Sequence, residues 1–437
     1  YQCYNVVSLT DMGKITTRNS IKINSNIGSA LDNTNCPIHN WYKFTAGFSY
    51  KFIDYIIGMH SSEPHCIYEP FAGCGTTLVA AQEKGISAIG NEGQKFMCDI
   101  INAKLNWDLD SKISHDYLKS LLGKIKTFNG DLSDEYHPLL ETLYDNISLR
   151  NLYILRDAIA QITDNEYRLF FNLALSQTLH KAALHPIAVP YIVRSKFQSH
   201  SGDVPGKFSS IIEKMLADLE TVKGDVRTAQ VFYADSRFKN ENIKDGVCDM
   251  CITSPPYLNN LDYGEVSKVH THFFGYTSNW HDITDKVRKH LVTGSTTHYA
   301  NSDFKMEDFL QSEFAQKNKD LIPSLIAKYD QLKALYRIRN GKKSFHILMM
   351  EYFNDMYSVL KEMRRVLQND SRAYLIMGDS APYGVTIPTT DYLGQIAETT
   401  GFKGYAIQKI RSRGHKWKGL SHRHNVELSE NILELIG

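Results

Sequence analysis

The sequence has almost no net charge. Its 437 residues include 49 Lys and Arg against 48 Asp and Glu, which leaves a formal charge of +1. This excludes a protein that holds nucleic acid by bulk charge alone, so any such partner must bind at local basic clusters. Hydrophobic residues make up 42% and charged residues 22%, which excludes a disordered chain and predicts a folded protein of two to three domains.

Long apolar runs and paired cysteines are also missing. No stretch approaches the roughly 18 apolar residues that a membrane span needs. The first ten residues show no basic patch followed by an apolar run, so we expect no signal peptide. The seven cysteines are odd in number and scattered along the chain. These absences favour reduced thiols and a cytoplasmic protein that does not bind a membrane.

A βαβ unit is the clearest structural pattern. Residues 66–71 predict a buried strand, residues 72–75 a turn, and residues 78–84 a helix that Gly85 ends. Residues 86–91 predict a second strand. Because a strand, a helix and a strand in this order form a right-handed crossover, the unit implies a parallel sheet.

Two long stretches interrupt this pattern. Further strands are predicted at 231–233, 247–253 and 373–377, helices at 353–367 and 392–400, and a hairpin near the C-terminus. We therefore predict an α/β protein with a doubly wound, Rossmann-like sheet and two large, mainly helical or irregular insertions. The predicted parts are an N-terminal arm (1–40), a discontinuous sheet domain (41–107 and 228–437), and insertions at 108–227 and 262–345.

The turn after the first strand resembles a loop that binds a nucleotide-type ligand. Gly73 and Gly75 let the backbone approach a ligand closely, and the following helix offers free N–H groups at its N-terminus. Leu78 stands where the dinucleotide fingerprint needs a third glycine, which disfavours a nicotinamide cofactor. Glu92 ends the second strand, where a carboxylate can accept from both hydroxyls of a ribose. The alternative is a tight turn without a ligand.

The segment Thr253-Ser254-Pro255-Pro256-Tyr257 follows an apolar strand and suits amino-group chemistry. Two consecutive prolines fix two φ angles and remove two donors, so rigid carbonyls stand at the strand end. The exocyclic amino group of a nucleobase is a poor nucleophile because its lone pair is delocalised into the ring. Ser254 Oγ and the Pro255 carbonyl are candidate acceptors for its two N–H bonds, and Tyr257 can stack on the base, which must be flipped. The alternative is a Pro-Pro turn that closes a strand.

Together, these motifs resemble those of the amino-group DNA methyltransferases, which use S-adenosylmethionine to methylate cytosine N4 or adenine N6. Residues 69–77 resemble their cofactor motif, and residues 253–257 resemble their catalytic motif. Residues 41–57 resemble the helix-start motif that covers the methionine end of the cofactor. Residues 234–237 resemble the turn whose Asp meets the adenine amino group. A serine at the first catalytic position is most often seen in N4-cytosine enzymes, so cytosine N4 is favoured over adenine N6.

The resemblance implies a Rossmann-like methyltransferase that acts in the cytoplasm of a bacterium or archaeon. Its substrate would be double-stranded DNA with the target base flipped, and its partner a cognate restriction endonuclease. The resemblance assigns no metal, and it makes both insertions candidates for target recognition. It implies catalytic roles for Ser254, Pro255, Pro256 and Tyr257. The residues that it implies in cofactor binding are Phe44, Ser49, Glu69, Phe71, Ala72, Gly73, Gly75, Thr76, Glu92, Asp235 and Thr253.

Other functions stay open at this point. An RNA amino-methyltransferase would use a related Asn/Asp-Pro-Pro-Tyr motif, and a nucleic-acid-binding scaffold could keep the fold without catalysis. No Pro-Cys dipeptide occurs, which argues against C5-cytosine methyltransferases and their covalent mechanism. Residues 331–350 and 399–426 lack acidic residues and are rich in Lys and Arg. They predict phosphate contacts, with a solvated basic face as the alternative.

Two groups of potential metal ligands are better explained otherwise. Cys248 and Cys251 resemble half of a metal site, but both lie in an apolar strand and are predicted to be core thiols. The spacing of His270 and His272 predicts positions in a strand or loop.

Overall fold

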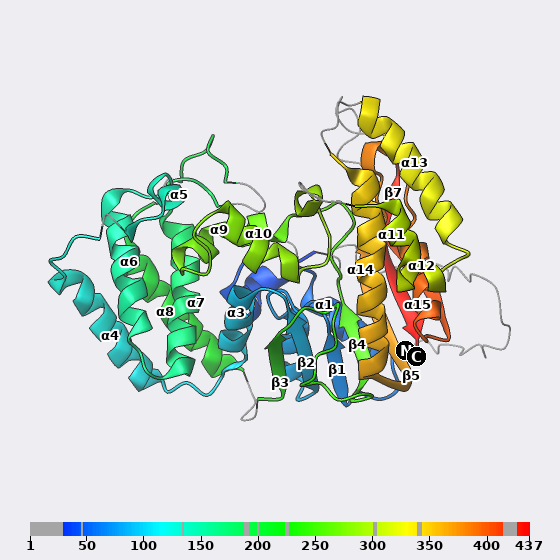
Figure 1. Cartoon of the computed structure of the whole chain (residues 1–437). Coiled ribbons are helices and arrows are strands. Elements are labelled where there is room, and N and C mark those ends of the chain that lie inside the picture. The colour runs from blue at the N-terminus through cyan, green and yellow to red at the C-terminus, as the bar shows by residue number, and fades with distance from the viewer. Residues whose placement is uncertain are drawn as a thin grey trace.

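A seven-stranded sheet runs through the protein (Figure 1). The computed structural model describes residues 29–44, 47–132, 135–187, 192–198, 201–222, 227–299, 304–338, 343–413 and 426–437. The strand order is β3-β2-β1-β4-β5-β7-β6. Strands β1 to β5 are parallel, and β7 is antiparallel to both of its neighbours. The expected Rossmann-like α/β fold is thus confirmed. The strands are β1 (Cys66–Glu69), β2 (Ser87–Glu92), β3 (Ala229–Tyr233), β4 (Cys248–Thr253), β5 (Leu367–Gly378), β6 (Gly404–Arg413) and β7 (Leu428–Ile436).

Helices cover both faces of the sheet, because successive side chains of a strand point to opposite sides. Ile67 and Ile252 pack in one apolar cluster with α1 (Tyr50–Gly58), α2 (Thr76–Glu83) and α3 (Lys95–Leu105). Tyr68 and Cys251 pack in a second cluster with α14 (Phe345–Val366) and α15 (Thr389–Thr399). Cys248 and Cys251 are free and buried, as predicted for core thiols.

The first insertion is a helical bundle next to α3, at the β3 end of the sheet (Figure 1). Four of its five helices begin at aspartates whose carboxylates accept from first-turn N–H groups, which is the usual role of an N-cap. These caps are Asp110, Asp145, Asp164 and Asp203. The helices are α4 (Ser111–Thr127), α5 (Pro138–Glu141), α6 (Asn146–Ala160), α7 (Asn165–Ala182) and α8 (Val204–Thr221).

The second insertion is also largely helical. Its helices are α9 (Tyr263–Phe273), α10 (Trp280–Lys286), α11 (Met306–Gln311), α12 (Glu313–Lys317) and α13 (Ile322–Ile338). His270 and His272 lie inside α9, so the strand or loop predicted for them is wrong. Asp262 caps this helix, and both histidines are buried in it. A helix that is buried on several sides lacks the one-sided apolar pattern from which helices are predicted.

The segment before α1 is folded against the sheet domain where the structure describes it. Two short 3-10 helices, η1 (Asp32–Asn35) and η2 (His39–Trp41), form in this part of the segment that the composition predicted to be a loose arm. Ile38 between them is fully buried. None of the helices in the described ranges has the length and hydrophobicity to cross a membrane.

The topology places a ligand site at the carboxyl ends of β1 and β4. From β1 the chain proceeds to β2 and β3 on one side, and then crosses to β4 on the other side of β1. In open α/β sheets a crevice forms at such a switch point, outside the carboxyl ends of the strands. The glycine turn follows β1, and the double-proline segment follows β4.

Candidate active site

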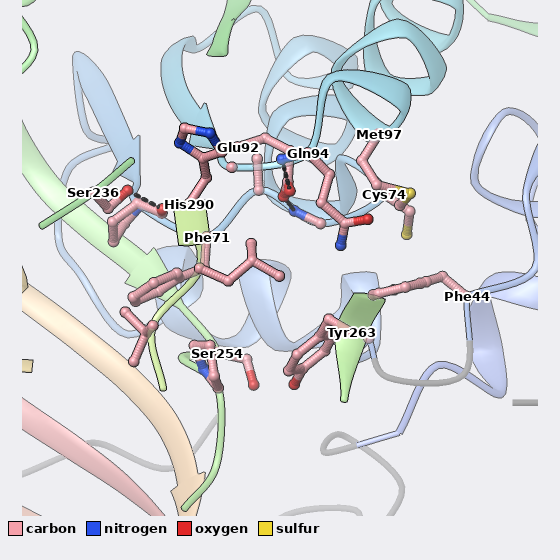
Figure 2. Close-up of a pocket in the computed structure, with 18 of the residues that line it drawn as sticks. Phe44, Phe71, Cys74, Glu92, Gln94, Met97, Ser236, Ser254, Tyr263 and His290 are labelled. Atoms are coloured by element: carbon pink, nitrogen blue, oxygen red, sulfur yellow. Dashed lines mark hydrogen bonds between the residues drawn. The ribbon is translucent and has the colours of Figure 1, made fainter. Parts of the chain in front are cut away.

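A cavity that is open to solvent lies at this crevice (Figure 2). Gly73 and Ser254 both line it, although they are far apart in the sequence. The spatial meeting of the two motifs is therefore present in the structure. The predicted site residues that line the cavity are Phe44, Phe71, Ala72, Gly73, Thr76, Glu92, Asp235, Ser254 and Pro256.

The glycine turn requires its glycines. Gly73 has a φ of +55° and Gly75 a φ of +85°, in the left-handed region that favours glycine. A Cβ on Gly75 would also lie 3.2 Å from the side chain of Ile101 in α3. Gly75 precedes α2, and no side chain caps this helix. The first N–H groups of α2 therefore start where the turn faces the cavity.

Glu92 is held in place in the cavity wall by backbone amides (Figure 2). Its Oε2 accepts from Gly73 N at 2.8 Å, and its Oε1 accepts from Gln94 N at 2.8 Å. Burial raises the pKa of the carboxyl group to about 7, although these amides oppose the rise. A carboxylate fixed in this way can accept hydrogen bonds from two neighbouring hydroxyl groups.

The double-proline segment presents Ser254 to the cavity and is supported from behind. Ser254 lies near Tyr263 in the cavity wall (Figure 2). Tyr352 Oη donates to the Pro256 carbonyl at 3.0 Å. Tyr257 does not line the cavity. Its hydroxyl lies 3.4 Å from Glu430 Oε1, and the guanidinium of Arg413 lies over its ring at 5.2 Å.

Comparison with known proteins agrees with this geometry. The family model for DNA methylases of the N6/N4 group matches residues 16–103. The Type II methyltransferase M.BsoBI of Geobacillus stearothermophilus is 24% identical over 469 residues, which cover 94% of this chain and 87% of that protein. The chain is thus similar to DNA methylases of the N6/N4 group, through the family model over residues 16–103 and through M.BsoBI over most of its length. M.AvaI of Nostoc sp., another Type II methyltransferase, is 20% identical over 420 residues (88% and 85%). M.MjaII of Methanocaldococcus jannaschii is 32% identical over 98 residues (22% and 18%).

Some residues expected to bind a ligand support the cavity without lining it. These residues are Ser49, Glu69, Gly75, Thr253, Pro255 and Tyr257. Ser49 caps α1 by accepting from Lys51 N at 3.2 Å and donates to Asp32 at 2.9 Å. Asp235 does line the cavity, but its carboxylate pairs with Arg237 at 2.6 Å. A ligand that used this carboxylate would share it with the guanidinium.

Glu69 connects the glycine turn with the double-proline segment. Its Oε1 accepts from Phe71 N at 3.0 Å and from the Thr253 hydroxyl, and its Oε2 accepts from the Thr77 hydroxyl at 2.8 Å. The side chain is buried, and this burial raises the pKa of the carboxyl group to about 8 despite the three donors. The residue thus joins β1, β4 and α2 at the point where the cavity begins.

We predict that Glu69→Gln flattens the pH dependence of stability. The pKa of Glu69 in the folded state, about 8, lies above its ordinary value of 4.5. The protonated Glu69 carboxyl group therefore stabilises the folded wild-type protein fully below pH 4.5, and this stabilisation is lost as the pH rises through 8. The free energy of unfolding falls by about 1.4 kcal/mol for each unit by which the two pKa values differ. Urea unfolding at pH 5, 6.5 and 8 measures the effect. The pKa of Glu92 is raised as well, so the Glu69→Gln variant should keep part of the dependence of stability on pH.

The matched control for this experiment is Glu241→Gln, because the Glu241 side chain is 78% exposed. It should keep the wild-type slope. An equal slope in wild type and Glu69→Gln would show that Glu69 is not a buried, protonated carboxyl group.

Sequence reasoning missed the roof of the cavity. His290, Leu291 and Val292 line it, and all three come from the second insertion. No local pattern identifies such residues, because only the path of the insertion brings them to the cavity. Gln94 and Met97 were also missed, but they follow Glu92 in the same βα connection. Their position after a strand end is a signal that could have identified them.

We predict that Gly93→Ala displaces this roof. A Cβ on Gly93 would lie 2.8 Å from Leu291 Cδ2 and even closer to the His290 carbonyl oxygen. Because a backbone oxygen cannot rotate away, the strand end and the roof must separate. We expect a loss of about 1–3 kcal/mol in stability and a roughly tenfold weaker affinity for S-adenosylmethionine, measured by calorimetry. Gly123→Ala is the control, since a Cβ there meets no atom within 4 Å. It should preserve the affinity, and because alanine is favoured over glycine inside a helix such as α4, it should not lower stability.

Proposed function

We propose that this DNA methylase transfers a methyl group from S-adenosylmethionine to the N4 amino group of a flipped cytosine at a specific DNA sequence. The observation that carries the proposal is the single cavity shared by Gly73, Glu92 and Ser254. Gly73 and Glu92 suit the binding of a nucleoside, and Ser254 suits the binding of an amino group. All three lie at the same edge of the sheet. The Type II methyltransferases among its relatives support a role beside a cognate restriction endonuclease.

The residues of the cavity suit S-adenosylmethionine. Glu92 would accept from the ribose hydroxyls, because its two oxygens are already aligned by Gly73 and Gln94. Phe44 and Phe71 would provide apolar contacts, and the glycine turn would let the ligand approach the backbone. Asp235 would meet the adenine end while it keeps its pair with Arg237. When bound, S-adenosylmethionine supplies an electrophilic methyl group on a sulfonium.

Ser254 would orient the amino group of the target base. Its hydroxyl oxygen would accept one N–H of the amino group. The carbonyl of Pro255, which stands between the cavity-lining Ser254 and Pro256, would accept the other when the base enters. Two acceptors at fixed positions pull the nitrogen toward a tetrahedral shape and direct its lone pair at the electrophile. Tyr257, whose ring is fixed by Arg413 and Glu430, would hold the position of the segment from behind. A strong base is not needed, because the alkylated amine is acidic and loses its proton readily.

DNA would approach the cavity from the side of the C-terminal hairpin. The basic stretch predicted at 399–426 includes Arg411 and Arg413, which lie on β6, and the guanidinium of Arg413 lies over the ring of Tyr257. The remainder of this stretch, residues 414–425, lies outside the described residues. Both insertions are candidates for base recognition, and the second one contributes Tyr263 and His290 to the cavity wall.

Nucleoside analysis of methylated DNA tests the proposal. Duplex DNA is incubated with the enzyme and S-adenosylmethionine that carries a deuterated methyl group, then digested and analysed by mass spectrometry. We expect labelled N4-methylcytosine. Labelled N6-methyladenine would replace the cytosine assignment with adenine, and labelled nucleosides from structured RNA but not from DNA would favour an RNA methyltransferase. No label in either substrate, together with no affinity for S-adenosylmethionine, would indicate a scaffold.

A further inference from the structure

Three potential metal ligands form a cluster outside the methylase cavity. The sulfur of Cys36, a ring nitrogen of His39 and a carboxylate oxygen of Glu83 all lie within 4.8 Å of one another. Cys36 follows η1, His39 begins η2, and Glu83 ends α2. Among the residues that the structure describes, this is the one group of three His, Cys, Asp or Glu side chains so arranged.

We propose that Cys36, His39 and Glu83 bind a zinc ion, which fastens the segment before α1 to the end of α2. Thiolate, imidazole and carboxylate are the ligands that zinc takes in proteins, at about 2.0–2.3 Å. A Cys-x-x-His spacing on one turn with a third ligand from another element suits such a site. The inference is independent of the proposed function, because it concerns different residues.

The histidine is the strongest argument for a ligand. The His39 side chain is 1% exposed, and its Nε2 atom is buried without a hydrogen-bond partner. Glu83 Oε2 lies 3.5 Å from this nitrogen, which leaves a gap between two groups that face each other. A buried polar atom without a partner costs stability, so native proteins usually satisfy it. A metal ion between Nε2 and Oε2 would satisfy both atoms.

The ring of His39 is also fixed in direction. It stacks on Tyr50, with ring centroids 5.2 Å apart. Its backbone carbonyl lies 3.3 Å from the ammonium of Lys104, which donates to the Cys74 carbonyl at 3.0 Å as well. A ligand held by packing and by hydrogen bonds to its own backbone needs little reorganisation when an ion binds.

The charges in the cluster match a divalent cation. The Cys36 thiolate that forms when the ion displaces its proton and the Glu83 carboxylate together carry two negative charges. These charges would balance Zn²⁺ and leave a neutral site beside the buried Lys104. Three protein ligands leave a fourth position for water, which can enter because the Glu83 side chain is 29% exposed.

The ion would also steady one wall of the cavity. Asn33, in the same folded segment, donates to the Phe48 carbonyl at 2.9 Å and lies 3.5 Å from the Thr76 hydroxyl. Phe48 and Thr76 both line the cavity. Fastening the segment at Cys36 and His39 therefore stabilises the position of Asn33 and of the residues that it contacts.

Metal titration of the full chain tests the proposal. The protein is treated with a chelator, dialysed and titrated with Zn²⁺ by calorimetry, without S-adenosylmethionine or DNA. We expect one Zn²⁺ per chain and a rise in Tm on its addition. Co²⁺ should give the visible absorption of a tetrahedral site with a thiolate ligand. Cys36→Ser and His39→Asn should weaken Zn²⁺ binding at least 100-fold and abolish the Co²⁺ signal.

The control variant is His115→Asn. His115 pairs with Glu213 at 3.2 Å on the surface, and no cysteine belongs to this pair. The variant should therefore bind Zn²⁺ as the wild type does. Glu83→Gln keeps the experiment decisive if a change of a buried ligand prevents folding, because Glu83 lies at a partly exposed helix end. It should weaken binding at least tenfold. Absence of Zn²⁺ binding to the wild type, or equal binding by wild type and a folded Glu83→Gln variant, would overturn the proposal.

Discussion

Ser254→Ala should lower kcat for methyl transfer by about 10²- to 10³-fold, the loss typical of one preorganised group at a reacting centre. The variant removes one of the two acceptors that would direct the amino lone pair. It leaves the glycine turn and Glu92 unchanged, so the Kd for S-adenosylmethionine should stay within about twofold of wild type. Single-turnover methylation of duplex DNA and calorimetric titration of the cofactor measure the two quantities separately.

A serine outside the site provides the control for this prediction. Ser358 in α14 donates to the Asn354 carbonyl of its own helix and does not line the cavity. Ser358→Ala should therefore keep both values. If Ser254→Ala methylates at the wild-type rate, the hydroxyl does not act on the amino group. If it loses cofactor affinity in the same proportion as activity, it has disturbed the whole cavity.

Glu92→Gln should raise the Kd for S-adenosylmethionine by about 10- to 100-fold. Both oxygens of the carboxylate accept from backbone N–H groups, so a glutamine places its NH₂ group against one of these donors. It also removes the charge that strengthens hydrogen bonds to ribose hydroxyls, which contribute about 1.5–3 kcal/mol each. The maximal rate at saturating cofactor should fall far less than in Ser254→Ala.

The pH dependence gives this prediction a distinct signature. The pKa of Glu92 is raised to about 7 in the absence of ligand. If only the carboxylate form accepts the ribose hydroxyls, the wild-type affinity should be constant above pH 7 and fall about tenfold for each unit below it. Glu92→Gln should lack this dependence. A cofactor affinity that is equal at pH 5.5 and 8 in the wild type would contradict the assignment of Glu92.

The centre of the fold could be predicted from the sequence because its signals are local. A buried strand, the glycines at 73 and 75, and a second strand that ends in Glu92 follow one another within one short stretch. Their conformations are fixed by neighbours in the sequence. The same holds for the double-proline segment after β4. The switch-point rule then predicts that both face one crevice, as Gly73 and Ser254 do.

The residues that could not be predicted depend on long-range contacts. Helix α14 begins at Phe345 rather than at 353, because its first turns are buried against α13 as well as the sheet, which hides the helical period. His290 to Val292 reach the cavity only through the path of the second insertion. The support of Tyr257 by Glu430 and Arg413 forms when the C-terminal hairpin pairs with β5, far from the catalytic segment in sequence.

A comparison of single-turnover methyl-transfer rates at increasing cofactor concentration tests the central claim most directly. Wild type, Glu92→Gln and Ser254→Ala are each mixed with duplex DNA and increasing S-adenosylmethionine, and a single turnover is followed. The shared cavity, with separate tasks for its two motifs, predicts that high cofactor concentration restores the rate of Glu92→Gln but not that of Ser254→Ala. Recovery of Ser254→Ala at high cofactor concentration, or failure of Glu92→Gln to recover, would contradict it.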